Sequence, residues 1–334
     1  MKRGISRRRF IRITAAAAGV SLAPAFASGG AKPAELRQWH GVALGADASL
    51  QIYHPDPLAA DRLIAAALDE VRRLERIFSL YRADSALVCL NRDGRLDAPP
   101  AELVELLSIS SRFSRLTDGA FDVTVQPLWA LYAKHFSVPD ADPAGPSKHA
   151  IAGARALVGY EAVHVDPATI RLARDGANIT LNGIAQGYAT DRVADLLRGL
   201  GCEHTLVDMG EIRAIGDHPA HRLWEVALRD PRDDALSLGT ITLRDMSVAT
   251  SSGLGTPFDS AGRFNHIFDP SNGTCASRYL SVSVKTARAT VADALSTAFS
   301  LMPMESAKRV LAACGGGQAL FADWNGRLTT VRSD

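Results

Sequence analysis

The feature that most constrains the fold of this 334-residue chain is a succession of short β-like segments after residue 200, which helices do not separate in strict alternation. Parallel strands need a crossover connection, usually a helix, whereas consecutive short strands pair as antiparallel hairpins. The chain is therefore predicted to have an α+β fold, with largely antiparallel sheets packed with helices. The predicted strands are 44–53, 205–208, 212–215, 224–228, 238–243, 279–284, 319–322 and 328–331.

Helices are predicted where apolar residues recur at helical spacing. The clearest is 57–78, because Asp56 can cap its start and Pro57 suits the first turn. The composition, with 47% hydrophobic and 22% charged residues, supports a large core and excludes a disordered chain, a coiled coil and a polytopic membrane protein. The other predicted helices are 100–116, 184–200, 291–301 and 305–313, and residues 140–148 are predicted to form a surface loop.

The N-terminal residues 1–27 carry six basic side chains and no acidic one. Paired arginines precede Phe10-Ile11, an apolar run follows, and Ala25-Phe26-Ala27 has the small-x-small pattern that signal peptidase cleaves. We interpret this segment as a twin-arginine signal peptide for export to the periplasm, followed by one domain over 28–334. The alternative is a basic helix on a membrane surface. Because the apolar run is short and contains Pro24, no stable membrane span is expected after cleavage.

The charge balance argues against a nucleic-acid-binding protein. The chain has 37 Lys and Arg residues against 36 Asp and Glu residues, and the part after residue 27 has a net charge of −5. Dedicated nucleic-acid-binding domains usually carry a basic excess instead. The cysteines are too widely spaced for a zinc-binding pair. The sequence leaves two states for them, a disulfide or buried free thiols. They are Cys89, Cys202, Cys275 and Cys314.

Common nucleotide-binding and hydrolase motifs are absent from the sequence: no GxGxxG follows a strand, and there is no Walker loop, GxSxG or HExxH. Two glycine-containing turns stand out instead. In 117–128, acidic and threonine residues crowd a tight bend, which is more than packing alone requires and indicates a functional segment. The alternative is that Asp122 simply caps the next short helix. In 180–191, a predicted strand turns into a helix whose start suits a phosphate, and the alternative is an ordinary strand-to-helix connection. Gly187 in that helix costs about 1 kcal/mol relative to Ala and needs a structural reason.

Two further segments carry groups suited to catalysis. His266 stands beside the turn 269–273, where an imidazole can take a proton from a hydroxyl near neutral pH; the alternative is a structural histidine. Asp293 and Thr297 are four residues apart, so a carboxylate and a hydroxyl share one helix face and suit Mg²⁺ with phosphate oxygens. The alternative is a hydrogen bond on the helix surface, but the neighbouring residues are apolar, and a buried unpaired Asp is costly.

Taken in their order along the chain, these segments resemble the ApbE family, the FAD:protein FMN transferases. The resemblance extends from about residue 41 to the last strands, and it implies an ApbE-like fold. The motifs that carry it are Phe78-Ser79-Leu80-Tyr81-Arg82 with Ser85 and Asn91, residues 118–128, Ile184-Ala185-x-Gly187-Tyr188, Val207-Asp208-x-Gly210, Val248-Ala249-Thr250-Ser251, His266-Ile267-x-Asp269-Pro270-x-x-Gly273 and Ala292-Asp293-Ala294-x-Ser296-Thr297.

The resemblance implies a Mg²⁺-dependent enzyme that transfers FMN from FAD to a Thr or Ser hydroxyl of an exported acceptor flavoprotein and releases AMP. FAD would be a substrate, and His266 would be the base that activates the acceptor hydroxyl. The alternatives are an FAD pyrophosphatase that forms FMN and AMP, and a periplasmic flavin-binding protein without activity. The Mg²⁺ ligands would be Asp293, Thr297 and the carbonyl of Gly183, and the FAD site would be lined by Leu44, Tyr81, Ala120, Phe121, Asp122, Gln186 and Ile267.

The sequence departs from the usual family pattern at five positions. The family has Lys where this chain has Gln186, and glycine where it has Asn182 and Glu211. It also has an acidic residue at the position of Thr180 and a methionine at that of Leu44. Gln186 in place of Lys removes a positive charge near the nucleotide. The run Asn-Gly-Ile-Ala-Gln-Gly that begins at Asn182 also resembles an exported subgroup that includes the flavin transferase accessory to nitrous oxide reductase.

Overall fold

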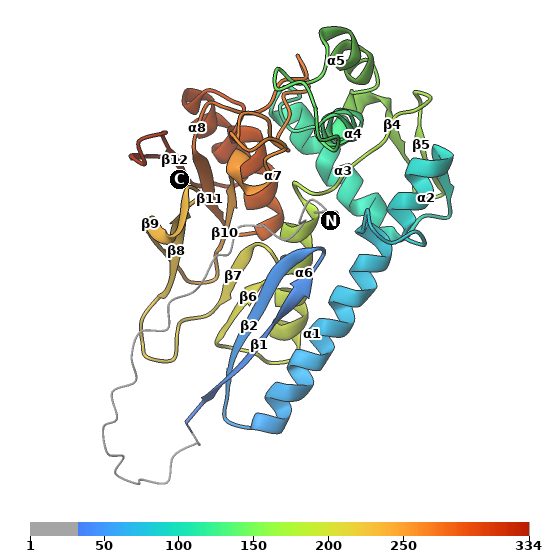
Figure 1. The fold of residues 1–334 in the computed structure, drawn as a ribbon. Helices are drawn as coiled ribbons and strands as arrows, with labels where there is room; N and C mark the ends of the chain where they lie inside the picture. Colours follow the sequence, from blue (N-terminus) through green and yellow to red (C-terminus); the bar gives the residue numbers. More distant parts are fainter. Residues whose placement is uncertain (1–32, 334) are drawn as a thin grey trace.

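The structure is a computed structural model that describes residues 33–333, and the signal peptide predicted at 1–27 lies outside the described residues. The main element of the fold is an eight-stranded sheet in the order β1-β2-β6-β7-β10-β11-β12-β13, with every neighbouring pair antiparallel (Figure 1). The predicted α+β fold with largely antiparallel sheets is thus confirmed. Its strands are β1 (Glu35–Ala43), β2 (Ala46–His54), β6 (Thr205–Asp208), β7 (Ile212–Ile215), β10 (Ser247–Ser251), β11 (Ser281–Thr286), β12 (Gly317–Ala322) and β13 (Leu328–Ser333).

Two smaller antiparallel sheets accompany the main sheet within residues 33–333. One is the hairpin of β8 (Trp224–Asp230) and β9 (Asp233–Leu243), and its apolar side chains pack on the main sheet. The other has three short strands in the order β3-β5-β4. These are β3 (Arg95–Asp97), β4 (Val163–Val165) and β5 (Thr169–Leu172).

The longest described helix, α1 (Pro57–Phe78), has the bounds that the sequence predicts. The side chain of Asp56 caps it by accepting a hydrogen bond from the N–H of Leu58 at 2.9 Å. No described helix combines the length and the apolar character that crossing a membrane requires. The others are α2 (Ala86–Asp93), α3 (Ala101–Leu116), α4 (Gln126–His135), α5 (Lys148–Arg155), α6 (Ala185–Gly199), α7 (Ala289–Phe299) and α8 (Met304–Ala313), with short 3₁₀ turns η1 (Val123–Val125), η2 (Tyr160–Ala162) and η3 (Gly253–Gly255).

The strand predicted at 44–53 is one half of a hairpin whose other half, β1, the sequence pattern did not predict. β1 and β2 are joined by a two-residue turn in which Leu44 and Gly45 both have positive φ, 49° and 84°. Positive φ at both central residues is the geometry that connects antiparallel strands most tightly. Leu44 is therefore a turn residue and not the first residue of a strand.

The prediction of a strand directly before α6 was wrong. Residues 177–181 are extended and largely buried, but they pair with no strand. The side chain of Asn91 takes the place of a partner strand: it accepts from the N–H of Ile179 at 2.7 Å and donates to its carbonyl at 2.8 Å. The N–H of Thr180 donates to the carbonyl of Val123. Because these contacts satisfy the buried backbone, the segment needs no sheet.

The two faces of the main sheet bury different cores. Alternate side chains of a strand point to opposite faces, so on β6 Val207 packs with residues of α1 and α6, whereas Leu206 packs against the β8–β9 hairpin. Helices α7 and α8 cover β11 and β12, where Val284 and Phe321 are buried. Helices α6 and α7 consequently lie on the same layer and pack against each other (Figure 1). The four cysteines, all within the described residues, are free thiols.

The contact between the starts of α6 and α7 depends on Gly187. A Cβ at this position would lie 2.3 Å from the carbonyl oxygen of Ala289 and 2.7 Å from the Cβ of Asp293. Both distances are far below van der Waals contact, so only glycine lets the two helices approach this closely. This close approach is the structural reason for a glycine inside a helix.

Replacing Gly187 with Ala is expected to destabilise the protein by about 1–3 kcal/mol, because the new methyl group must push α7 away from α6. The free energy of unfolding in urea measures this loss. Gly199→Ala is the matched control in the same helix, because a Cβ there meets no atom within 4 Å. Equal stability of the two variants would contradict the close-packing explanation.

Candidate active site

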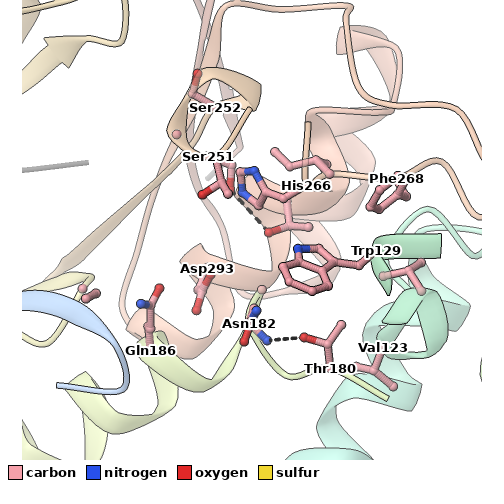
Figure 2. A pocket seen from close by; sticks show the side chains of 18 of the residues that line it. Val123, Trp129, Thr180, Asn182, Gln186, Ser251, Ser252, His266, Phe268 and Asp293 are labelled. Atoms are coloured by element: carbon pink, nitrogen blue, oxygen red, sulfur yellow. Dashed lines mark hydrogen bonds between the residues drawn. The ribbon is translucent and has the colours of Figure 1, made fainter. Parts of the chain in front are cut away.

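A cavity of about 810 Å³ lies where the starts of α6 and α7 face α4 and the loop that follows β10. Figure 2 shows Gln186 and Asp293 on one side of this cavity and Trp129 and Phe268 on the other. Leu44 lies apart from it and lines a small adjoining hollow that includes Tyr81. The remaining residues assigned from the sequence all line the cavity: Tyr81, Ala120, Phe121, Asp122, Gly183, Gln186, His266, Ile267, Asp293 and Thr297.

The three residues assigned as metal ligands meet where α7 crosses the turn before α6. Asp293 is 3% exposed, and its Oδ2 accepts a hydrogen bond from the N–H of Gly187 at 2.9 Å. A Cβ at Gly183 would lie 2.9 Å from the hydroxyl oxygen of Thr297, so the turn and the hydroxyl are in close contact. The hydroxyl of Ser251, at the end of β10, is 3.4 Å from that of Thr297. These contacts gather a carboxylate, hydroxyls and a backbone turn around one point.

The start of α7 is held in place by the buried carboxylate of Asp191 on α6. Its oxygens accept hydrogen bonds from the N–H groups of Ala289 and Thr290, at 3.0 and 2.9 Å, and so cap the helix that carries Asp293. The same carboxylate pairs with the buried guanidinium of Arg213 at 2.8 Å and with Arg288 at 3.2 Å. Asp191 lies within the segment that the sequence singled out, yet its role depends on residues about 100 positions away and no local pattern reveals it.

Removing this carboxylate with Asp191→Ala is expected to cost about 3 kcal/mol, because it uncaps α7 and leaves part of the Arg213 charge buried without a partner. Chemical unfolding monitored by circular dichroism measures the loss. Asp195→Ala is the matched control, since Asp195 pairs with the same two arginines but its side chain is 42% exposed; it is expected to cost under about 1 kcal/mol. The explanation fails if the two variants lose the same stability.

The cavity is rich in carboxylate and poor in positive charge. Burial raises the pKa of Asp293 to about 7, and burial with the nearby charges of Asp293 and Asp208 raises the pKa of Glu211 well above its usual value. None of the described residues that line the cavity is Lys or Arg. A cation would stabilise the ionised carboxylates here, because an opposite charge offsets the cost of burying them.

The donor atoms at this point fit Mg²⁺, which prefers hard oxygen ligands and usually combines one or two carboxylates with substrate phosphates. Asp293 supplies a buried carboxylate, Thr297 a hydroxyl, and the turn at Gly183 a backbone carbonyl close to that hydroxyl. Within residues 33–333, no three His, Cys, Asp or Glu side chains gather in an arrangement that could hold a metal ion. A metal at this site therefore takes its remaining ligands from other oxygens, such as those of a phosphate.

The turn before α6 offers fewer free N–H groups than a helix start usually does. The N–H groups of Ile184 and Ala185 donate to the carbonyl of Leu181, and that of Tyr188 donates to the carbonyl of Ile184. The N–H of Gly187 donates to Asp293. Because these donors are already used, the helix start alone supplies little of the stabilisation that a diphosphate needs.

His266 lies in the loop between η3 and β11 and lines the cavity (Figure 2). Its Nδ1 is buried and has no hydrogen-bond partner, and burial lowers the pKa of His266 to about 4. The neighbouring Asn265 anchors this loop by donating to the carbonyl of Ala276 at 2.8 Å and accepting from the N–H of Ile267 at 3.1 Å. The imidazole is therefore neutral at pH 7. The backbone of Thr256 also contacts the ring, and Nδ1 is the nitrogen that has no protein partner.

Asp122 has the local capping role that the sequence left open. Its carboxylate accepts from the N–H and the hydroxyl of Thr124, at 2.7 and 2.6 Å, and from the N–H of Tyr160 at 2.9 Å. The side chain caps η1 and ties it to η2 while it also lines the cavity. Its oxygens thus have protein donors, although burial outweighs these hydrogen bonds and raises the pKa of Asp122.

The sequence analysis did not identify the aromatic wall of the cavity. Trp129 of α4 and Phe136, which directly follows that helix, line the cavity with Phe258 and Phe268 from the loop after β10. Figure 2 shows Trp129 and Phe268 on the side opposite Asp293. Trp129 and Phe258 pack edge to face, with their ring centroids 5.9 Å apart. In the sequence, only the cluster of aromatic residues over 129–136 could have indicated this wall. Such a wall suits a flat aromatic ligand, while the opposite end offers oxygen ligands.

The comparisons with known proteins agree with this geometry. A family model described as the ApbE family matches residues 44–321. Among curated proteins, an FAD:protein FMN transferase of Treponema pallidum is 32% identical over 307 residues, covering 83% of this chain and 82% of that protein. Another protein of that name, from Vibrio cholerae, is 30% identical over 284 residues, covering 82% of this chain and 84% of its own length.

Solved structures show the same fold. The crystal structure of the ApbE protein from Thermotoga maritima matches with a TM-score of 0.77 at 29% identity, covering 90% of this chain and 97% of that one. The apo form of the flavinyl transferase ApbE from Pseudomonas stutzeri matches with a TM-score of 0.72 at 27% identity, covering 90% and 96%. The similarity thus includes the elements that carry the cavity.

Proposed function

The chain belongs to the ApbE family and is an enzyme, an FAD:protein FMN transferase, and from this premise we propose how its site works. It transfers FMN from FAD to a Thr or Ser hydroxyl of an exported acceptor protein, with the help of Mg²⁺, and it releases AMP. The observation that carries this proposal is the meeting, in one cavity, of the Asp293–Thr297 pair and a neutral His266 with a free Nδ1.

FAD binding is supported by the two unlike ends of the cavity. The aromatic wall around Trp129 and Phe258 suits the flat isoalloxazine ring, and the turn at Gly183 with Asp293 suits the diphosphate. Asp293, Thr297 and the carbonyl of Gly183 would hold Mg²⁺. When bound, this ion supplies positive charge that stabilises the phosphoryl oxygens and the leaving phosphate.

In the transfer step, Nδ1 of His266 accepts the proton of the acceptor hydroxyl, whose oxygen attacks the phosphorus on the FMN side of the diphosphate. A phosphoester bond to the acceptor forms, the bond between the two phosphates breaks, and AMP leaves with the second phosphate. Asn265 keeps the His266 loop in place through its two backbone hydrogen bonds.

Export to the periplasm is the second part of the proposal, and its support is the twin-arginine pattern in residues 1–27. An exported enzyme meets acceptor proteins that face the periplasm. Fractionation of cells that produce the full chain, with Lys replacing both Arg7 and Arg8 as the control, tests this location.

Replacing Asp293 with Asn is expected to reduce flavin transfer at least about 100-fold, because the amide removes the buried negative charge that holds the cation. In-gel flavin fluorescence of a candidate acceptor after SDS electrophoresis measures transfer. Chelation of Mg²⁺ in the wild-type protein should give the same loss, and added Mg²⁺ should reverse it. Unchanged transfer by Asp293→Asn would remove Asp293 from the site, and AMP release without a fluorescent acceptor would favour the pyrophosphatase alternative.

The lowered pKa of His266, about 4, predicts how activity depends on pH. A base must be neutral, and the neutral fraction of an imidazole falls only as the pH falls through its pKa. At saturating Mg²⁺, which keeps the proposed ligand Asp293 ionised, the kcat/KM for FAD should therefore stay level between pH 8 and about pH 5.5. An ordinary histidine, with a pKa near 6.5, would lose half its neutral form at pH 6.5. A midpoint near 6.5 would contradict the buried-base assignment, as would wild-type transfer by His266→Ala.

A further inference from the structure

The proposed function leaves one buried carboxylate of the cavity unused, that of Glu211. This residue stands directly before β7, lines the cavity and is 6% exposed. Its Oε2 is buried and has no hydrogen-bond partner, while the backbone of Thr250 interacts with the carboxylate. A buried carboxylate oxygen without a donor is unfavourable unless it binds a cation or takes up a proton.

No Lys or Arg among the described residues that line the cavity compensates for Glu211. Three of the described residues that line the cavity have carboxylates, Asp122, Glu211 and Asp293, and none is Lys or Arg. Asp122 is satisfied by three hydrogen bonds from Thr124 and Tyr160. Glu211 and Asp293 remain, and both line the cavity. Burial, together with the nearby negative charge of Asp293, raises the pKa of Glu211. The two carboxylates therefore face a common space that lacks positive charge.

The side chain nearest to the backbone before Glu211 is neutral. A Cβ at Gly210, the residue before Glu211, would lie 2.9 Å from the side-chain Cδ of Gln186. The amide of Gln186 therefore lies at this end of the cavity and brings no positive charge to it. A divalent cation would supply that charge, because it neutralises two carboxylates.

We propose that Glu211 is a direct ligand of the divalent cation in this chain, and that Glu211 and Asp293 bind the ion together before the nucleotide arrives. This inference rests on the proposed function, which assigns the cation to Asp293 and Thr297. Two carboxylates and one divalent ion form a neutral group, so binding relieves both their mutual repulsion and the cost of their burial. With few N–H donors free at the start of α6, the preloaded ion becomes the principal positive charge that meets the diphosphate.

Titration of the FAD-free full chain with Mn²⁺, followed by the electron paramagnetic resonance signal of the free ion, tests this assignment without any assay of activity. Glu211→Gln, which keeps the shape and removes the charge, is expected to weaken Mn²⁺ binding about 10- to 100-fold. Glu211→Gly is a second variant that removes the whole side chain, and it should show the same loss. Glu225→Gln on β8 is the matched control, because its side chain is 60% exposed and outside the cavity, and it should bind Mn²⁺ like the wild type.

Thermal unfolding gives a second readout. Without metal, Glu211→Gln should melt at a higher temperature than the wild type, because one of two repelling buried carboxylates is gone. With saturating Mn²⁺, its gain in melting temperature should be smaller than that of the wild type.

Equal Mn²⁺ affinity of the wild type and Glu211→Gln would overturn the inference, and so would a wild-type protein that binds no Mn²⁺ without FAD. Asp293→Asn separates the two proposals. If it loses Mn²⁺ binding while Glu211→Gln does not, Glu211 is not a ligand but the metal site of the proposed function stands. If neither variant loses binding, the metal assignment itself fails, whereas transfer of FMN is judged by the acceptor fluorescence assay.

Discussion

The close packing of α6 on α7 is the interaction on which the whole site depends. Gly187 allows the two backbones to meet, its N–H donates to Asp293, and Asp191 caps the start of α7 from the same helix. These contacts join residues about 100 positions apart in the chain. They place the oxygen ligands at the end of the cavity and fix the orientation of Asp293 before any ligand binds.

The chemistry of the cavity follows from what surrounds these helices. One end has buried carboxylates and no Lys or Arg among the described residues that line it, and the other has the aromatic wall. The part of the chain after residue 27 has a net charge of −5, so its overall field does not attract a diphosphate. Selectivity for such a ligand must arise locally. Under the proposed function it comes from a cation at the carboxylate end and from stacking at the aromatic end.

Much of the fold was predictable where local pattern and tertiary role agree. The bounds of α1, β6 and β7 match the predicted ranges, because each element buries one continuous apolar pattern. The prediction of secondary structure failed where local pattern and tertiary contacts do not correspond. The extended segment 177–181 is satisfied by the side chain of Asn91, and helix α5 has no buried residue, so its apolar pattern carries little information. Leu44 looked like a strand residue because its positive φ has no signature in a leucine.

The sequence by itself determined the fold class, the family resemblance, and the chemical character of Asp293, Thr297 and His266, because residue type and local spacing carry that information. Only the tertiary structure decided which of these groups meet, because the contacts between α6, α7 and the end of β10 form across long stretches of chain. It also showed that Asp122 accepts hydrogen bonds from its own turn and from Tyr160 of η2, whereas Glu211 has a buried oxygen without a partner. Burial and hydrogen bonding, which no linear pattern records, separate these two carboxylates.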